Sequence, residues 1–454
     1  MSPVLILGLG ITGLSVIDRL KGKPDLIGFD EGFDRFPPDL RRKLKSNLSA
    51  IVTDRRLLAP RIREASRIIA SPGIPLGSLG LRPADPKVVG DLDLAYARRR
   101  GGKFLAVTGT NGKTTTTKLL ALMLTARHGS RQVAVAGNIG TPLLDTVGRK
   151  KNMHYVVELS SFQLELSKRF RPAVGIFLNL SQNHLDRHES MKSYFEAKAR
   201  LFRNIGRGDT AVINLDDPYG RRLARRIRGT SSARMVGFSL NPVMDSDAVW
   251  IRGHRVRGRI RGKIRDLFDL PENLFGPGKH NQSNLLAASA AALSVGVGPD
   301  DIRKAISRFR LPAHRLEFVT EVGGVSYYDD SKATSVDAAR KALESFPSRQ
   351  IIALMGGQDK GMDFTPLFRE LTRRRNLKTL VFFGALGEKF HRLAGRFLLP
   401  NRRVNTVASA VRVSKDLAAP GDVVLLSPGG TSFDHYESYE ERGKDFRRCV
   451  ERLG

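Results

Sequence analysis

The stretch LAVTGTNGKTTTTKLLALML, residues 105–124, decides the fold. It places an apolar strand, a glycine turn and an apolar helix directly after one another. The backbone N–H groups of such a turn converge at the positive end of a helix dipole, which suits phosphate. The turn itself reads GTNGKTT from Gly109 to Thr115, and the first glycine of the full G-x-x-x-x-G-K-[ST] motif is missing. We predict that Lys113 reaches the β- and γ-phosphates of a nucleoside triphosphate and that the Thr114 hydroxyl binds Mg²⁺. The alternative is a Gly/Asn turn in an ordinary βα unit.

Length and cysteine content limit the class of protein. A chain of 454 residues is too long for one compact core, so two or three α/β domains are expected. Cys449 is the single cysteine, which excludes a disulfide within the chain and favours the cytoplasm. No run approaches the roughly 18 apolar residues of a membrane span. The start MSPVLILGLG lacks a basic leader region, so we interpret it as the first strand of a folded domain.

The net charge of +31 comes from arginines spread along the whole chain, and they are densest in IRGHRVRGRIRGKIR, residues 251–265. A nucleic-acid surface favours a localised patch with aromatic side chains, and here the charge is dispersed and His254 is the only ring in the segment. Steering of a polyanionic small substrate is a second explanation. We favour a third, a solvated strand pair with Val256, Ile260 and Ile264 facing inward, and expect no nucleic-acid partner.

The first ninety residues alternate short apolar strands with helical stretches, which is typical of a parallel, doubly wound sheet. VLILGLG, LIGFD and RIIASPG are the expected strands. The first turn contains Gly8-x-Gly10-x-x-Gly13, and Asp30 follows about twenty residues later, as in a dinucleotide-binding fingerprint. The phosphate loop near residue 109 leaves space for only half of an NAD-binding fold. A single mononucleotide half could equally hold a uridine diphosphate.

A second pattern, from about residue 103 to 310, begins at the phosphate loop. HYVVE is an apolar strand that ends in Glu158, a position suited to Mg²⁺. VGIFLNL is another strand, and it leads into a polar cluster at Asn183, His184, Asp186 and His188. Glu158 and His184 could therefore bind the metal beside Thr114, although a lone histidine is more often structural. An alanine-rich helix follows Gly278.

A third pattern follows a proline-containing boundary near residue 310. VSYYDDSKAT, QIIALMGGQDKG, TLVFFGALG and DVVLLSPGGTS are strands that each end in a polar or glycine turn. Open α/β sheets bind ligands at the carboxyl ends of their strands. This rule predicts one crevice that is faced by Asp330, Lys332, Thr334, Lys360 and Ser432. Lys332 and Lys360 could neutralise a phosphoryl group or a carboxylate, or they could be ordinary loop lysines.

Eleven ordered motifs give the chain a resemblance to the Mur ligase family over essentially its full length, closest to the member that adds D-glutamate. They are GLGITGLS at 8–15, SPGIP at 71–75, TGTNGKTT at 108–115, GNIGTPL at 137–143, ELSSFQLE at 158–165, NHLDRH at 183–188, YFEAKARLF at 194–202, HNQSN at 280–284, PAHRLE at 312–317, DDSKAT at 329–334 and LSPGGTSFD at 426–434.

The resemblance implies three α/β domains, each with a largely parallel sheet. They are a Rossmann-like UDP-substrate domain at 1–93, a central P-loop ATP-binding domain at 94–310 and a Rossmann-like amino-acid-binding domain at 311–454. It also implies a cytoplasmic, monomeric enzyme of peptidoglycan precursor synthesis with no membrane span, which uses ATP and Mg²⁺. The carboxylate of UDP-N-acetylmuramoyl-L-alanine would attack the γ-phosphate to give an acyl phosphate. The amine of D-glutamate would then displace phosphate through a tetrahedral intermediate.

The resemblance also implies roles for individual residues. Catalysis would involve Lys113, His184, Lys198 and Lys332. ATP would be held by Gly109, Thr110, Asn111, Gly112, Lys113, Thr114, Thr115, Asn281, Asn284, Arg315 and Asp330. The UDP substrate would contact Gly10, Ile11, Thr12, Asp30, Ser71, Pro72, Gly73, Asn138 and Ser160. D-Glutamate would lie against Thr334, Lys360, Ser432, Phe433 and Tyr439. The metal would lie near Thr114, Glu158, His184 and Lys198, the last as a carbamate, whereas the plain interpretation of Lys198 is a positively charged surface lysine.

Two positions depart from the family pattern. Glu31 and Gly32 stand where the family member places Thr-Arg against uracil, so backbone groups would have to replace those contacts. Tyr439 stands where a phenylalanine is expected in the glutamate pocket, which adds a hydroxyl but keeps the ring.

Three alternatives to a D-glutamate-adding enzyme remain at this point. A sibling ligase would add L-alanine or a diamino acid, but the Asp-Asn-Pro-Arg-type segment expected of the diamino-acid enzyme is missing. A folylpolyglutamate synthetase would lack the first, UDP-binding domain. An arginine-rich nucleic-acid-binding or scaffolding protein with an inactive ligase fold would not need the complete loop, metal and third-domain motifs.

Overall fold

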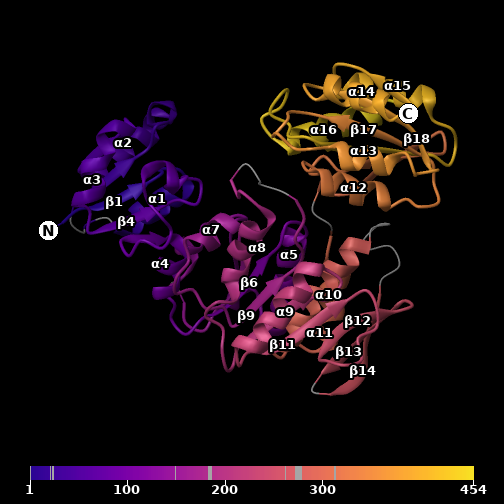
Figure 1. Ribbon diagram of the computed structural model, residues 1–454. Coiled ribbons are helices and arrows are strands. Elements are labelled where there is room, and N and C mark those ends of the chain that lie inside the picture. Colours follow the sequence, from indigo (N-terminus) through magenta and orange to yellow (C-terminus); the bar gives the residue numbers. More distant parts are fainter. Residues whose placement is uncertain are drawn as a thin grey trace. The chain divides into compact units, whose positions relative to one another are not determined.

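The computed structural model describes residues 2–20, 22, 25–148, 150–182, 187–260, 262–270, 279–310 and 313–454. Within them the strands form three sheets, of five, nine and six strands (Figure 1). The chain divides into two compact units. The first unit (1–180, 187–268 and 284–308) contains the first two sheets, and the second (181–186, 269–283 and 309–454) contains the third.

The first sheet is entirely parallel and has the order β3-β2-β1-β4-β5. Its apolar strands are buried because helices connect them, as the alternating pattern of the sequence predicts. The strands are β1 (Val4–Leu7), β2 (Leu26–Phe29), β3 (Ala50–Val52), β4 (Arg67–Ala70) and β5 (Val88–Gly90). The connecting helices are α1 (Ile11–Leu20), α2 (Pro38–Asn47) and α3 (Leu58–Glu64).

The second sheet has the order β14-β13-β12-β11-β10-β9-β6-β8-β7 and is parallel from β7 to β12. Its strands are β6 (Lys103–Thr108), β7 (Val133–Gly137), β8 (His154–Glu158), β9 (Val174–Phe177), β10 (Thr210–Asn214), β11 (Arg234–Ser239), β12 (Ala248–Arg252), β13 (Arg255–Ile260) and β14 (Lys263–Asp269). The helices of this region are α4 (Asp91–Ala97), α5 (Lys113–His128), α6 (Leu143–Thr146), α7 (Ser161–Glu165), α8 (Met191–Ala199), α9 (Pro218–Thr230), α10 (Lys279–Ser294) and α11 (Pro299–Arg308).

Helix α4 connects the first two sheets. It contacts α6 and α7. Asp93 in α4 is buried, and its carboxylate accepts hydrogen bonds from the backbone N–H groups of Lys168, Arg169 and Phe170 at 2.8–2.9 Å. One continuous apolar core includes side chains from both sheets, for example Ile6 and Phe104. Both sheets therefore pack as one unit.

The arginine-rich segment forms the expected strand pair, because β12 and β13 are antiparallel neighbours. Val256 is fully buried and Ile260 is half-buried. The prediction that Ile264 faces inward is wrong, since its side chain is 38% exposed. Ile264 lies in β14, the edge strand, where only Leu267 and Phe268 are buried.

The third sheet has the order β15-β16-β20-β17-β18-β19, with β15 as an antiparallel edge on otherwise parallel strands. Its strands are β15 (Glu317–Val322), β16 (Val325–Asp329), β17 (Ile351–Gly356), β18 (Leu377–Phe383), β19 (Asn401–Arg403) and β20 (Val423–Gly429). Its helices are α12 (Val336–Glu344), α13 (Thr365–Leu371), α14 (Gly387–Arg396), α15 (Val407–Leu417) and α16 (Tyr439–Glu451). The fold class expected from the sequence is confirmed, with three largely parallel sheets.

The turn between β1 and α1 depends on one glycine. A Cβ on Gly13 would lie 2.1 Å from the carbonyl oxygen of Gly8, so a side chain there would force the helix away from the turn. We predict that Gly13→Ala lowers the free energy of unfolding by about 2–3 kcal/mol, since overpacking against backbone is hard to relieve. Urea denaturation measures this change.

Gly10→Ala is the matched control, because a Cβ on Gly10 would meet nothing within 4 Å. It should leave the unfolding free energy within about 0.5 kcal/mol of wild type, or improve it slightly. Equal stability of the two alanine variants would contradict the proposed close contact between the turn and the helix.

Candidate active site

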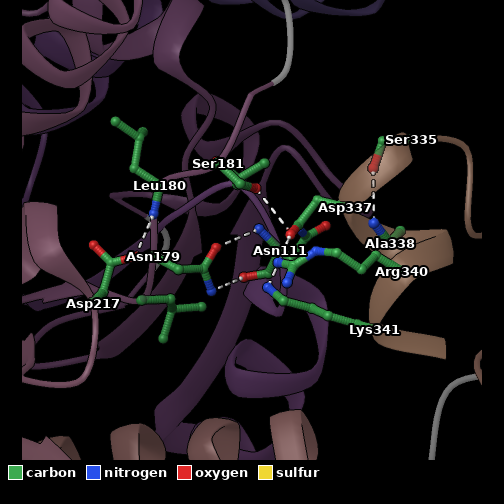
Figure 2. A network of polar contacts seen from close by, with 12 residues as sticks. Asn111, Asn179, Leu180, Ser181, Asp217, Ser335, Asp337, Ala338, Arg340 and Lys341 are labelled. Carbon is green, nitrogen blue, oxygen red and sulfur yellow. Dashed lines mark hydrogen bonds and ion pairs between the residues drawn. The ribbon is translucent and has the colours of Figure 1, made fainter. Parts of the chain in front are cut away.

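The phosphate loop connects β6 to α5, and helix α5 begins at Lys113. Gly112 has φ +85°, and a Cβ there would lie 2.1 Å from Oδ1 of Asn284. Asn179, which follows β9, forms two hydrogen bonds with the loop (Figure 2). The Asn111 N–H donates to Asn179 Oδ1 at 2.9 Å, and Asn179 Nδ2 donates to the Asn111 carbonyl at 3.1 Å. These contacts fix a backbone shape that presents N–H groups at the start of a sixteen-residue helix.

Glu158 lies directly beside this loop. It ends β8, which is paired in parallel with β6, and Val107 is its register partner. The buried carboxylate accepts one hydrogen bond from the Thr114 hydroxyl and one from the Asn138 amide, each at 2.9 Å. Carboxylate and hydroxyl oxygens at a phosphate loop are ligands that suit Mg²⁺. His184, the other predicted metal ligand, lies outside the described residues.

Lys198 lies on α8, and its side chain is only 2% exposed. Its Nζ donates to the Gly109 carbonyl at 3.0 Å, and Lys113 Nζ donates to the same oxygen at 3.0 Å. Burial, assisted by the positive charge of Lys113, holds the pKa of Lys198 well below its usual value. The interpretation of Lys198 as a surface lysine is therefore wrong, because the side chain is enclosed at the phosphate loop.

A cleft of about 630 Å³ lies in the first unit. Its walls come from the β1–α1 turn, the loop after β4, the loop after β7 and the start of α7. Helices α1, α4 and α7 all begin at or next to lining residues, so their N-terminal N–H groups lie around the cleft. Eight of the nine residues predicted for the UDP substrate line it: Gly10, Ile11, Thr12, Ser71, Pro72, Gly73, Asn138 and Ser160.

Asp30, the ninth residue, is not among the described residues that line the cleft. Its carboxylate accepts hydrogen bonds from the backbone N–H groups of Leu9 at 2.8 Å and Gly32 at 2.9 Å. It thereby supports the turn whose other residues face the cleft. The neighbouring Glu31 forms an ion pair with Arg55 at 2.8 Å.

Arg187 is a residue that the sequence did not single out. Its guanidinium donates to the carbonyl oxygens of Pro72, Gly73 and Ile74 at 3.0–3.1 Å and lies 4.7 Å from the ring centre of Phe162. These three carbonyls belong to the loop that lines the cleft. Arg187 is part of the quoted motif NHLDRH. The motif does not indicate that Arg187 contacts a loop more than a hundred residues earlier.

In the second unit, the loops that follow β16, β17 and β20 are joined by backbone hydrogen bonds. The sheet order makes these strands neighbours. Gly429 N–H donates to the Ala333 carbonyl at 2.8 Å, and Gln358 and Thr431 exchange two hydrogen bonds at 2.8 and 3.0 Å. These three adjoining loops carry the residues predicted to face one crevice, namely Asp330, Lys332, Thr334, Lys360 and Ser432, and the crevice itself stays a prediction.

The structure defines the surroundings of five residues that were predicted to act on phosphate or to bind D-glutamate. Lys332 Nζ donates to the Tyr439 hydroxyl at 2.8 Å, so the hydroxyl that distinguishes Tyr439 from the expected phenylalanine has a defined partner. Phe433 is 66% exposed, and Lys360 is also exposed. Ser432 is buried, and its carbonyl accepts from the backbone of His435 and Tyr436.

The residues predicted for adenosine and phosphates fall into two groups. Asn281 and Asn284 lie one turn apart on α10 and are both buried. Asp330 is buried in the second unit, where it accepts from the Leu316 N–H at 3.2 Å and from the Ser427 hydroxyl at 3.3 Å. Burial raises the pKa of Asp330 to about 8, and the positive charge of Arg315 opposes this increase.

Arg442 is a second residue that the sequence did not single out. It lies on α16 with a fully buried side chain. Its guanidinium donates to the hydroxyl and the carbonyl of Ser331 and to the carbonyls of Gly430 and Thr431, at 2.8–3.2 Å. It therefore holds the loop after β16 and the loop after β20 together. The sequence did not indicate this role, because nothing distinguishes Arg442 from the many other arginines of the chain.

Comparison with known proteins identifies the family. Residues 107–292 match the Mur ligase middle domain, and residues 314–430 match the Mur ligase glutamate ligase domain. A UDP-N-acetylmuramoylalanine–D-glutamate ligase of Acidobacterium capsulatum is 38% identical over 98% of this chain and 95% of its own length. A protein of the same name from Caldicellulosiruptor bescii is 36% identical over 99% and 97%.

Solved structures show the same fold at low sequence identity. The MurF ligase of Thermotoga maritima in complex with ADP covers 100% of this chain and 99% of its own, with a TM-score of 0.62 and 16% identity. A pseudomurein peptide ligase of Methanothermus fervidus gives a TM-score of 0.61 at 18% identity and covers both chains fully. The chain belongs to the Mur ligase family. Within it, the similarity that spans almost the full length is to relatives named UDP-N-acetylmuramoylalanine–D-glutamate ligase.

The contacts of Arg442 lead to a prediction for stability. Arg442→Lys replaces a planar group that reaches four acceptors with a single ammonium, and leaves buried carbonyls unpaired. We expect the free energy of unfolding to fall by about 2–3 kcal/mol, as measured by urea denaturation.

Arg447→Lys on the same helix is the control. Arg447 forms a partly exposed ion pair with Glu317 at 2.7 Å, which a lysine can keep, so this change should cost no more than about 0.5 kcal/mol. If both variants lose the same free energy of unfolding, the four hydrogen bonds of Arg442 contribute no more to stability than a surface ion pair does.

Proposed function

We propose that this protein joins D-glutamate to UDP-N-acetylmuramoyl-L-alanine at the expense of ATP, in cytoplasmic peptidoglycan precursor synthesis. The observation that carries the proposal is the position of Glu158. Its carboxylate contacts Thr114 of the phosphate loop and Asn138 of the cleft, which connects a triphosphate seat to a seat for an anionic sugar substrate. The relatives' names supply the identity of that substrate.

We infer that the chain is organised as three domains, at 1–93, 94–310 and 311–454. The three separate sheets support this division. The first domain carries the β1–α1 turn of the cleft, the second carries the phosphate loop, and the third carries the three joined loops after β16, β17 and β20.

The first step is phosphoryl transfer. The alanyl carboxylate of the UDP substrate attacks the γ-phosphorus of ATP, the bond to the β–γ bridging oxygen breaks, and ADP leaves with that electron pair. Lys113 and the loop N–H groups would stabilise the transferred phosphoryl group. We assign Gly109–Thr115 to the phosphates, and Asn281, Asn284, Arg315 and Asp330 to the adenosine and phosphates of ATP.

The second step forms the amide. The D-glutamate amine attacks the acyl carbon, and inorganic phosphate leaves from the tetrahedral intermediate. We assign Lys360, Thr334, Ser432, Phe433 and Tyr439 to D-glutamate, because these residues lie on the joined loops of the second unit or, in the case of Tyr439, contact Lys332 there. The cationic side chain of Lys360 suits a substrate with two carboxylates, and we assign Lys332 to the phosphate.

Glu158, Thr114 and His184 are assigned to Mg²⁺, together with Lys198 as a carbamate. The bound ion would neutralise charge on the phosphates. The burial of Lys198 supports the carbamate, because an amine with a lowered pKa is neutral more often, and the neutral amine is the form that adds to CO₂. A carbamate also replaces a buried positive charge beside Lys113 with a negative one.

Other properties follow from the substrates and from the surface. UDP-linked precursors and ATP place the reaction in the cytoplasm. No helix among the described residues has the length and apolar character to cross a bilayer. The dispersed arginines give no reason to propose a nucleic-acid partner, and we propose a monomer.

The role of the phosphate loop leads to a prediction. Lys113→Ala should lower ADP formation at least about a hundredfold, because it removes a charge directed at the transferred group. Product formation is measured with ATP, UDP-N-acetylmuramoyl-L-alanine and D-glutamate together. Lys118→Ala removes the same charge from an exposed position on the same helix and should retain wild-type activity. Near-normal turnover by Lys113→Ala would exclude the assignment.

The carbamate leads to a second prediction. Lys198→Arg keeps a positive charge but cannot form a carbamate, so activity should fall at least about a hundredfold at saturating Mg²⁺. With ¹³C-labelled bicarbonate, wild type should show a carbamate signal that Lys198→Arg lacks.

Lys192→Arg, at an exposed position of the same helix, is the control and should keep both the signal and the activity. The thermal midpoint of Lys198→Arg identifies any loss that is due to misfolding alone. Substantial activity in a folded Lys198→Arg protein would rule out the carbamate.

A further inference from the structure

Asp91 is a carboxyl in the cleft to which neither the sequence motifs nor the proposed reaction assigns a role. It is the first residue of α4 and follows Gly90 at the end of β5. Asp91 is the only charged side chain among the described residues that line the cleft. It is nevertheless only 4% exposed.

The hydrogen bonds of Asp91 are incomplete. Its Oδ1 has no hydrogen-bond partner in the described part of the chain. The carboxyl group receives a side-chain hydrogen bond from Gln163, another lining residue, and backbone hydrogen bonds from Leu92 and from Asp91 itself. Burial raises the pKa of Asp91 to about 6, so the group is mainly ionised at neutral pH and above. A buried ionised oxygen without a partner is unfavourable unless a ligand supplies a donor.

The chemistry of the cleft limits what that donor can be. A diphosphate is best seated at the N-terminus of α1, where Gly10, Ile11 and Thr12 line the wall. A carboxylate would repel the diphosphate, so Asp91 has to face another part of the ligand. Gln163 lies on α7, whose N-cap is Ser160, and this helix follows Glu158 directly in the sequence. Because Asp91 receives a hydrogen bond from Gln163, it lies on the side of the cleft that α7 and the end of β8 form.

We propose that Asp91 is a substrate-binding residue that accepts a hydrogen bond from an amide N–H or hydroxyl of the sugar–lactoyl–alanyl part of the UDP substrate. This inference rests on the proposed function for the identity of the ligand. In this role Asp91 would favour binding of a complete UDP-sugar-peptide over a bare nucleotide. The helix N-terminus alone does not distinguish these two ligands.

Asp93, two residues later, is a matched comparison. It lies on the same helix and is also buried, but its carboxylate accepts three backbone hydrogen bonds and does not line the cleft. A purely structural acid at the start of α4 would behave like Asp93. A substrate-binding acid would behave differently.

The test is titration calorimetry of the full chain with two probes, UDP and UDP-N-acetylmuramoyl-L-alanine. Asp91→Asn preserves size and an oxygen for Gln163 but can present an N–H to the ligand in place of an acceptor. We expect it to weaken UDP-N-acetylmuramoyl-L-alanine about ten- to hundredfold, with UDP affinity and the thermal midpoint unchanged. Asp93→Asn should lower the thermal midpoint and leave both affinities unchanged. If Asp91→Asn does not fold, Asp91→Ser, a good residue at a helix start, is measured instead.

Each outcome is decisive. Unchanged affinity of the Asp91 variant for UDP-N-acetylmuramoyl-L-alanine overturns the proposal, and so does an equal loss for UDP, because the contact would then not involve the sugar-peptide. Failure of wild type to bind UDP-N-acetylmuramoyl-L-alanine overturns the proposed function itself, and this inference with it.

Discussion

The two hydrogen bonds on Glu158 are the contact on which the rest of the site depends. One joins the carboxylate to Thr114 at the start of α5, and the other joins it to Asn138 in the wall of the cleft. Glu158 is there because β8 is the parallel neighbour of β6, so the ends of both strands meet at one edge of the sheet. The phosphate loop and the wall of the cleft are therefore joined by the same carboxylate. A change in strand order would separate them.

The described lining of the cleft offers backbone N–H groups rather than cationic side chains to an anion. The net charge of +31 does not concentrate there, since Asp91 is the only charged side chain among the described lining residues. Helix N-termini supply N–H groups whose positions are fixed by the fold and need no flexible side chain to be ordered. Arginine has a different role at the site: Arg187 and Arg442 donate to loop carbonyls and hold binding loops in place.

Local patterns in the sequence were sufficient to predict much of this structure. The phosphate loop and the strand that ends in Glu158 are each encoded within a few neighbouring residues, where periodicity and glycine spacing can be recognised. The eight cleft residues were instead indicated by the resemblance to the Mur ligase family. Contacts between distant segments were not recognisable. The burial of Lys198 depends on a loop 89 residues earlier, and the contact from Arg442 to Ser331 spans 111 residues. Ile264 was misplaced because strand alternation does not reveal which part of an edge strand is covered.

The most direct test of the proposed reaction is phosphate release by the purified protein with ATP, UDP-N-acetylmuramoyl-L-alanine and one amino acid at a time. The panel contains D-glutamate, L-glutamate, L-alanine and a diamino acid, and mass spectrometry identifies the UDP-linked product. The joined loops of the second unit and the relatives together predict that D-glutamate alone gives phosphate and amide product in equal amounts. A higher rate with another amino acid, or phosphate release that does not depend on the UDP substrate, would contradict the proposal.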